Sequence, residues 1–107
     1  MIRVSYTLSD SKVVELNVTG HANFAKKGSD IVCSAVSAIV IGGLTNLSSE
    51  KNYKISVREG EVSILALNDV NEHDQIVLET IIVQLEKIEE SYGKYIQIDK
   101  IVRWKER

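Results

Sequence analysis

The sequence predicts an α+β fold of two layers, in which a largely antiparallel sheet of about five strands carries two helices on one face. Two pairs of segments alternate apolar and polar residues around a short turn, as β-hairpins do, and two longer segments repeat apolar residues at helical spacing. Their order along the chain is strand, strand, helix, strand, strand, helix, strand. The 107 residues contain no proline, internal repeat or linker, so we expect one domain over residues 1–107.

Five segments are expected to form the sheet. Residues 1–8 and 13–19 alternate around Ser9-Asp10-Ser11 and predict the first hairpin. Residues 54–58 and 62–67 predict the second hairpin, since Glu59-Gly60-Glu61 supplies the glycine that such turns favour. Residues 95–102 predict a last strand.

The first helix is expected over residues 31 to about 49 and is apolar on most of its faces. Such a helix needs cover on nearly every side, from its own sheet and from a source such as a second subunit. Gly42 and Gly43 lie inside it, where each glycine costs about 1 kcal/mol relative to alanine. They indicate either a close approach of backbones or a break in the helix.

The second helix is expected to begin after Asn71, a good N-cap residue, and to end near Tyr92. Gly93 would take the left-handed conformation that often follows a helix. His73, near the helix start, is expected to be a surface residue. The apolar stripe at helical spacing consists of Leu78, Ile81, Ile82, Leu85 and Ile88.

Composition excludes several classes of function. The net charge of −2 and the scattered basic residues give no footprint for direct nucleic-acid binding. A single cysteine cannot form an internal disulfide, which fits a reducing compartment such as the cytoplasm. The N-terminus resembles a strand rather than a signal peptide, and the apolar stretch 31–44 is too short to cross a membrane. One cysteine and two distant histidines predict no metal site, and the sequence has no phosphate-binding loop, so no cofactor is expected.

Cys33 and His21 are the candidate catalytic pair. Cys33 falls in the first turn of the first predicted helix if Ser29 or Asp30 is the N-cap, and unpaired amides there favour a thiolate and an oxyanion. His21 could take the thiol proton as general base and return it to a leaving amine. The carboxylate of Asp30 would disfavour the thiolate if it lay beside Cys33, but would orient the imidazole if it bonded to His21. The sequence leaves both arrangements open.

Other residues near this pair have supporting roles in the hypothesis. Ser37 lies one helical turn after Cys33, so its hydroxyl could reach the site. Gly20 and Gly28 flank the histidine loop as hinges that would let it close over a bound peptide. Two alternatives to catalysis remain open: a binding module in which Cys33 is buried and inert, and a redox sensor that works by oxidation of the thiol.

A specific motif joins these residues and resembles the ribosomal-processing cysteine protease family known as Prp. The similarity extends over essentially the whole chain in length and element order. Ser34 departs from it, since a smaller alanine is expected after the cysteine. The motif consists of Gly20-His21-Ala22, Gly28, Asp30-Ile31-Val32-Cys33 and Ala35-Val36-Ser37.

The resemblance implies a cytoplasmic bacterial endopeptidase with Cys33 as nucleophile, His21 as general base and supporting roles for Asp30 and Ser37. Its substrate would be the N-terminal peptide of large-subunit ribosomal protein number twenty-seven, cut after a pair of aromatic residues through a thioester intermediate. No cofactor would be needed. The resemblance also implies a homodimer, which agrees with the apolar first helix.

Overall fold

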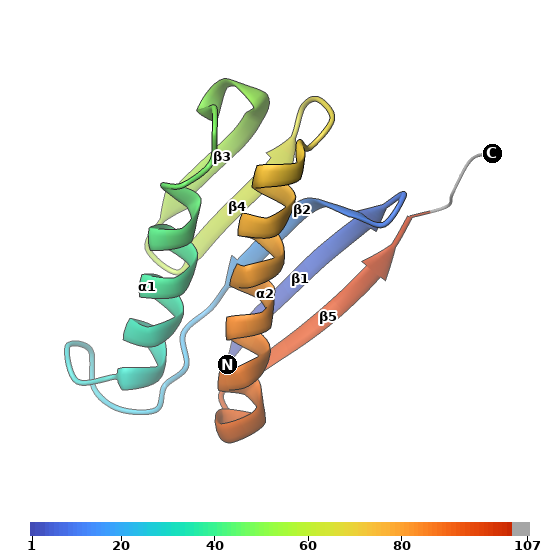
Figure 1. Cartoon of the computed structure of the whole chain (residues 1–107). Helices are drawn as coiled ribbons and strands as arrows, with labels where there is room; N and C mark the ends of the chain where they lie inside the picture. Colours follow the sequence, from blue (N-terminus) through green and yellow to red (C-terminus); the bar gives the residue numbers. More distant parts are fainter. Residues whose placement is uncertain (104–107) are drawn as a thin grey trace.

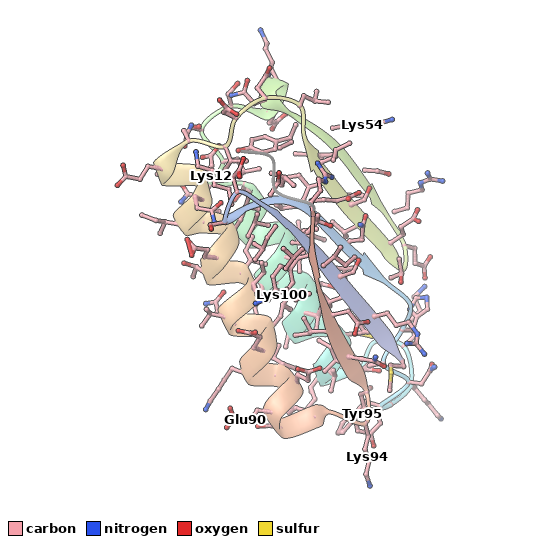
Figure 2. The ribbon with its side chains drawn as sticks, turned by 90° about the vertical axis from the view of Figure 1, so that its right-hand side faces the viewer. Lys12, Lys54, Glu90, Lys94, Tyr95 and Lys100 are labelled. Carbon is pink, nitrogen blue, oxygen red and sulfur yellow. The ribbon has the colours of Figure 1, made fainter. Side chains whose placement is uncertain are left out.

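The computed structural model describes residues 1–103 and has the predicted order of elements, with a five-stranded sheet and both helices on one of its faces (Figure 1). The sheet is mixed, with the strand order β3-β4-β2-β1-β5. Figure 2, a view turned by 90°, shows the side chains that fill the space between the two layers. The elements are β1 (Ile2–Ser9), β2 (Lys12–Thr19), α1 (Ile31–Leu44), the short 3₁₀ helix η1 (Glu50–Asn52), β3 (Tyr53–Arg58), β4 (Glu61–Ala66), α2 (Glu72–Tyr92) and β5 (Ile96–Val102).

Both predicted hairpins are present, and one strand pair is parallel. Asp10 and Ser11 adopt positive φ angles of 51° and 68°, as in the type I′ turns that match the twist of two adjacent strands. The hairpins join side by side because β2 pairs with β4 in antiparallel register, with Thr19 opposite Glu61. The last strand, β5, runs parallel to β1, with Ile2 opposite Ile96.

The first helix is shorter than predicted, because α1 ends at Leu44 and not near residue 49. The amides of Asn46 and Leu47 donate to Gly43 and Leu44, three residues back, so the helix tightens and stops. Gly43 is explained by a close contact: an added Cβ would lie 2.5 Å from Cγ1 of Ile81 on α2. Close packing of the two helices is therefore the reason for this glycine.

Only one side of α1 is covered within this chain. Its buried residues are Val32, Val36, Val40 and Leu44, one turn apart along a single stripe. In contrast, Ile31 is 55% exposed and Ile41 is 42% exposed. This chain therefore supplies only part of the cover that the sequence predicts for the helix, because the sheet and α2 lie on the same side of it.

The second helix begins after Asn71 and ends at Tyr92, both as predicted, but the residue that follows it has a different conformation from the one expected. The side chain of Asn71 accepts a hydrogen bond of 2.8 Å from the amide of Asp74, which confirms it as the N-cap. Gly93, however, has a φ of −59° and is right-handed. The amide of Tyr95 donates to the carbonyl of Tyr92 at 2.8 Å, so the chain continues in a right-handed turn toward β5.

A buried carboxylate connects the start of α2 with β3 and with the segment after α1. Asp74 is fully buried and accepts hydrogen bonds from the hydroxyl of Tyr53 at 2.6 Å and from the amide and hydroxyl of Ser48 at 2.9 and 3.0 Å. His73 is exposed, as expected, but its Nδ1 also lies 2.9 Å from Oδ1 of Asp74. We call this group of four residues the Asp74 cluster.

No helix within residues 1–103 is both long and apolar enough to cross a membrane.

Candidate active site

The loop that carries His21 runs from β2 to α1 and starts beside the first residue of the chain. Gly20 has a φ of 92° and its missing side chain leaves room for the carbonyl of Met1, which an added Cβ would overlap. The amide of Gly20 donates to the carbonyl of Gly60 at 2.9 Å. The loop therefore leaves the sheet next to the turn between β3 and β4.

Asp30 caps α1 and anchors the loop. Its Oδ1 accepts the amide of Cys33 at 3.0 Å, and its Oδ2 accepts the amides of Phe24 and Ala25 at 3.0 and 3.4 Å. The hydrogen bond from the Cys33 amide is the main reason that the pKa of Asp30 is lowered, and the bonds from the loop amides act in the same direction against the effect of desolvation. Of the two arrangements that the sequence left open for Asp30, the structure shows the carboxylate beside Cys33, as the cap of α1, and no hydrogen bond within residues 1–103 joins it to His21.

Cys33 is half-buried in the first turn of α1, as predicted, and its sulfur has one hydrogen-bond donor. The amide of Ala22 donates to Sγ across 3.3 Å. The donor comes from the histidine loop and not from the helix.

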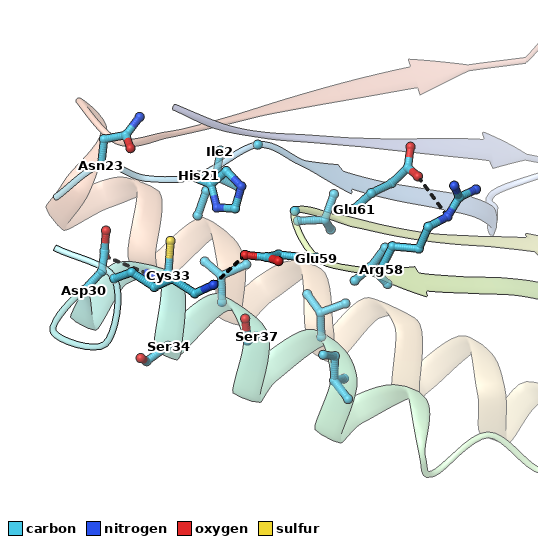
Figure 3. A pocket seen from close by; sticks show the side chains of 18 of the residues that line it. Ile2, His21, Asn23, Asp30, Cys33, Ser34, Ser37, Arg58, Glu59 and Glu61 are labelled. Carbon is cyan, nitrogen blue, oxygen red and sulfur yellow. Dashed lines mark hydrogen bonds and ion pairs between the residues drawn. The ribbon is translucent and has the colours of Figure 1, made fainter. Parts of the chain in front are cut away.

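His21 lies over Gly60, with an exposed ring. A Cβ on Gly60 would lie 2.8 Å from Nε2 of His21, so only glycine leaves room for the imidazole at this turn. Figure 3 shows His21 and the sulfur of Cys33 facing the same space. Within residues 1–103, His21 and Cys33 share no hydrogen bond in this resting structure.

Cys33 and His21 line a pocket of about 770 Å³ between α1, the histidine loop and the β3–β4 turn. Its apolar wall is formed by valines of α1 and of the second hairpin, namely Val36, Val40, Val57 and Val62. An exposed ion pair connects its two sides, since Nζ of Lys27 on the loop lies 2.9 Å from Oε1 of Glu59 on the turn (Figure 3). Lys27 lowers the pKa of Glu59, and His21 adds a smaller electrostatic effect in the same direction. Glu59 in turn raises the pKa of Lys27.

An aromatic cluster holds the other side of the loop. The ring of Phe24 packs edge-on against Tyr92 and Tyr95, with centroids 5.7 and 5.1 Å apart. Asn23, just before it, has a left-handed φ of 57°, which asparagine tolerates better than most residues. The segment after His21 is thus fixed by its backbone amides and by one aromatic side chain.

The pocket brings together every residue that the sequence singled out for the site: Cys33, His21, Asp30, Ser37, Gly20 and Gly28. The sequence analysis missed Glu59 and Gly60, which it placed in a hairpin turn without a link to the site. The pairing of β2 with β4 would have revealed this link, because it places the β3–β4 turn beside Gly20. No group of three or more histidine, cysteine or acidic residues within 1–103 is arranged to hold a metal ion.

Comparisons with known proteins identify the family. The family model described as cysteine protease Prp matches residues 1–97. The ribosomal processing cysteine protease Prp of Staphylococcus aureus is 34% identical over 106 residues, covering 92% of this chain and 98% of the relative. The protein of the same name from Mycoplasma pneumoniae is 36% identical over 99 residues, covering 90% of this chain and 93% of the relative.

Solved structures agree with this assignment. The crystal structure of the S. aureus ribosomal processing protease Prp with a covalently linked product peptide matches with a TM-score of 0.87 and 30% identity, covering 94% of this chain and 99% of that chain. A second structure of that protease, with a substrate peptide, matches with a TM-score of 0.80 and the same coverage. The chain whose loop, helix and pocket are described above belongs to the Prp family of cysteine proteases.

Proposed function

We propose that this chain is the endopeptidase that removes the N-terminal extension of a bacterial large-subunit ribosomal protein, with Cys33 as nucleophile and His21 as general base. The observation that carries the proposal is that one pocket holds both side chains, with an amide N–H directed at the sulfur. The printed names of the relatives, which describe ribosomal processing, supply the substrate class. The hydrogen bonds to Asp30 support a positioning role for that residue, since its carboxylate holds the backbone of both Cys33 and the loop.

The chemistry proceeds in two steps. His21 takes the thiol proton, and the thiolate attacks the scissile carbonyl to form a carbon–sulfur bond. The carbon–nitrogen bond then breaks, and the departing amine receives the proton from the imidazolium. Water, activated by the neutral imidazole, hydrolyses the thioester and restores the thiol. Every proton and electron pair is supplied by the protein, the peptide and water, so no cofactor enters.

The pocket also supports the proposed sequence preference for an aromatic pair. Val57, which is 52% exposed, and the partly buried Val62 line the pocket and offer apolar surface there. Aromatic side chains gain the most from such burial. The Lys27–Glu59 ion pair would have to open, or lie over the peptide, when a substrate enters. Of the two expected hinges, Gly28 follows Lys27 and can serve that motion, whereas Gly20 is packed against Met1 and the amides of Phe24 and Ala25 are held by Asp30.

The test is mass spectrometry of a synthetic peptide that matches the N-terminal extension of the ribosomal protein. Wild-type protein should cut it after the aromatic pair, whereas Cys33→Ala and His21→Ala should leave it intact. The matched control is His73→Ala, because His73 is the only other histidine in the sequence and lies on α2, away from the pocket. An intact peptide in every reaction would favour a binding module, and fast alkylation of Cys33 without cleavage would favour a redox sensor.

The homodimer belongs to the same proposal and rests on the uncovered side of α1. Ile31 and Ile41 expose apolar surface that a second copy would bury. Sedimentation velocity at micromolar concentration should show a dimer. A monomer at that concentration, together with full cleavage activity, would remove the dimer from the proposal while leaving the protease in place.

A further inference from the structure

The amides at the start of α1 are already occupied. The amide of Cys33 donates to Oδ1 of Asp30 at 3.0 Å, and the amide of Ser34 donates to the carbonyl of Asp30 at 3.1 Å. The amide of Val32 is also directed at the Asp30 carboxylate and helps to lower its pKa. A negatively charged cap therefore uses the donors that a nucleophile on a helix N-terminus would otherwise offer to an oxyanion.

The amide that faces the sulfur of Cys33 comes from the histidine loop. Ala22 is 3% exposed, and its N–H lies 3.3 Å from Sγ of Cys33. Its position is fixed from several sides, because Phe24 and Ala25 bond to Asp30 and the Phe24 ring packs on Tyr92. A donor held in this way does not have to reorient when charge develops in the transition state, and this preorganisation is the condition for strong electrostatic stabilisation.

We infer that the backbone N–H of Ala22 is the oxyanion donor of the reaction, an inference that rests on the proposed function. In the resting enzyme this N–H donates to Sγ of Cys33. When Sγ bonds to the scissile carbon, the carbonyl π pair moves onto oxygen, and this oxygen lies about 3 Å from both the nucleophile and the donor. The N–H then transfers its hydrogen bond from sulfur to oxygen. When the intermediate collapses, the pair returns to form the thioester carbonyl as the amine leaves.

The arrangement has a consequence for the loop. His21 and Ala22 are neighbours, so one short segment supplies both the base and the anion donor. A shift of this segment would disable proton transfer and oxyanion stabilisation together. Phe24 and Asp30, which fix the segment, act as positioning residues.

The test removes the single N–H group. Cys33 is the only cysteine, so chemical ligation between Val32 and Cys33 can join a synthetic 1–32 segment to the remaining chain. In one ligated protein Ala22 is replaced by lactic acid, which turns the amide into an ester without a donor. In the control, the backbone amide of Lys26 is replaced by an ester and the lysine side chain is kept. This amide donates no hydrogen bond within the described residues. The unmodified ligated chain must cut the peptide, and if it does not, the proposed function fails and the inference falls with it.

The expected result for the Ala22 ester is a kcat about 100-fold lower with KM little changed, since this is the usual effect of losing one oxyanion donor. A peptide aldehyde, which forms a tetrahedral adduct with the thiol, should bind correspondingly more weakly, while the cleaved product peptide binds as before. The ratio of these two affinities decides the question. If the ester leaves that ratio unchanged, whether both affinities hold or both fall, the N–H group does not contact the oxyanion and the inference is wrong.

Discussion

Asp74→Asn should destabilise the protein strongly at neutral pH and much less at pH 2. Burial alone would raise the pKa of Asp74, but hydrogen bonds from Tyr53, His73 and Ser48 outweigh it and lower the pKa to about 2. The side chain is fully buried, so the ionised form depends entirely on these donors. Asparagine keeps the volume but places an NH₂ group among donors, so at least one hydrogen bond is lost.

The magnitude follows from the shift. The pKa falls from 3.8 to about 2, and at about 1.4 kcal/mol per unit the ionised carboxylate adds on the order of 2 kcal/mol to folding stability. Because the folded-state pKa is lowered, this stability is present above pH 4 and is lost as the pH falls through about 2. The mismatched NH₂ group adds about 1 kcal/mol at any pH, so the variant should lose about 3 kcal/mol at pH 7 and about 1 kcal/mol at pH 2.

Urea unfolding of both proteins at pH 7 and pH 2 measures this difference. The matched control is Glu79→Gln, which removes a carboxylate from an exposed position on the same helix. Peptide cleavage by the folded variant should be unchanged, since the Asp74 cluster lies at the end of the helix layer opposite to the start of α1 (Figure 1). An equal loss of stability at both pH values would refute the reasoning, because it would show that the ionised carboxylate carries no special stability.

Three further changes test the packing of the site and core. Gly43→Ala places a Cβ 2.5 Å from the Ile81 side chain and should cost about 2 kcal/mol in urea unfolding, and an unchanged midpoint would contradict the close helix contact. Gly60→Ala displaces the imidazole of His21 that lies over this glycine and should lower kcat/KM about 100-fold with little change in secondary structure by circular dichroism, so full activity would contradict a role for His21 at this position. Phe24→Leu loses two edge-on contacts worth about 1 kcal/mol each. We expect the loss in kcat/KM, expressed as a free energy, to exceed the loss in the free energy of unfolding, whereas a purely structural role predicts the reverse.

Local features of the fold were predictable from the sequence. Asn71 as a helix cap and Asp10-Ser11 as a turn depend on contacts within three or four residues, which the sequence displays directly. The Cys33–His21 pair was also visible, because a motif with fixed spacing surrounds it. In each case the information lies in side chains that are close in the sequence.

Features that depend on distant partners were not predictable. An aspartate in the first turn of a helix is usually a surface residue, and nothing near Asp74 in the sequence indicates that Tyr53 and Ser48 surround it. The role of Glu59 depends on which strands pair, and the segment after α1 is held by Ser48, whose partner Asp74 lies 26 residues further along the chain. The Ala22 amide has no sequence signal at all, because every residue except proline has the same group.

The contact between Gly20 and Met1 has a practical consequence for the preparation of this protein. The chain begins beside the histidine loop, and Ile2 itself lines the pocket. An affinity tag fused before Met1 would emerge beside the pocket that holds Cys33 and His21, where it can block the entrance. A tag beyond β5 avoids this, since β5 ends at Val102, which pairs with Leu8 at the opposite end of β1 from Ile2 (Figure 1).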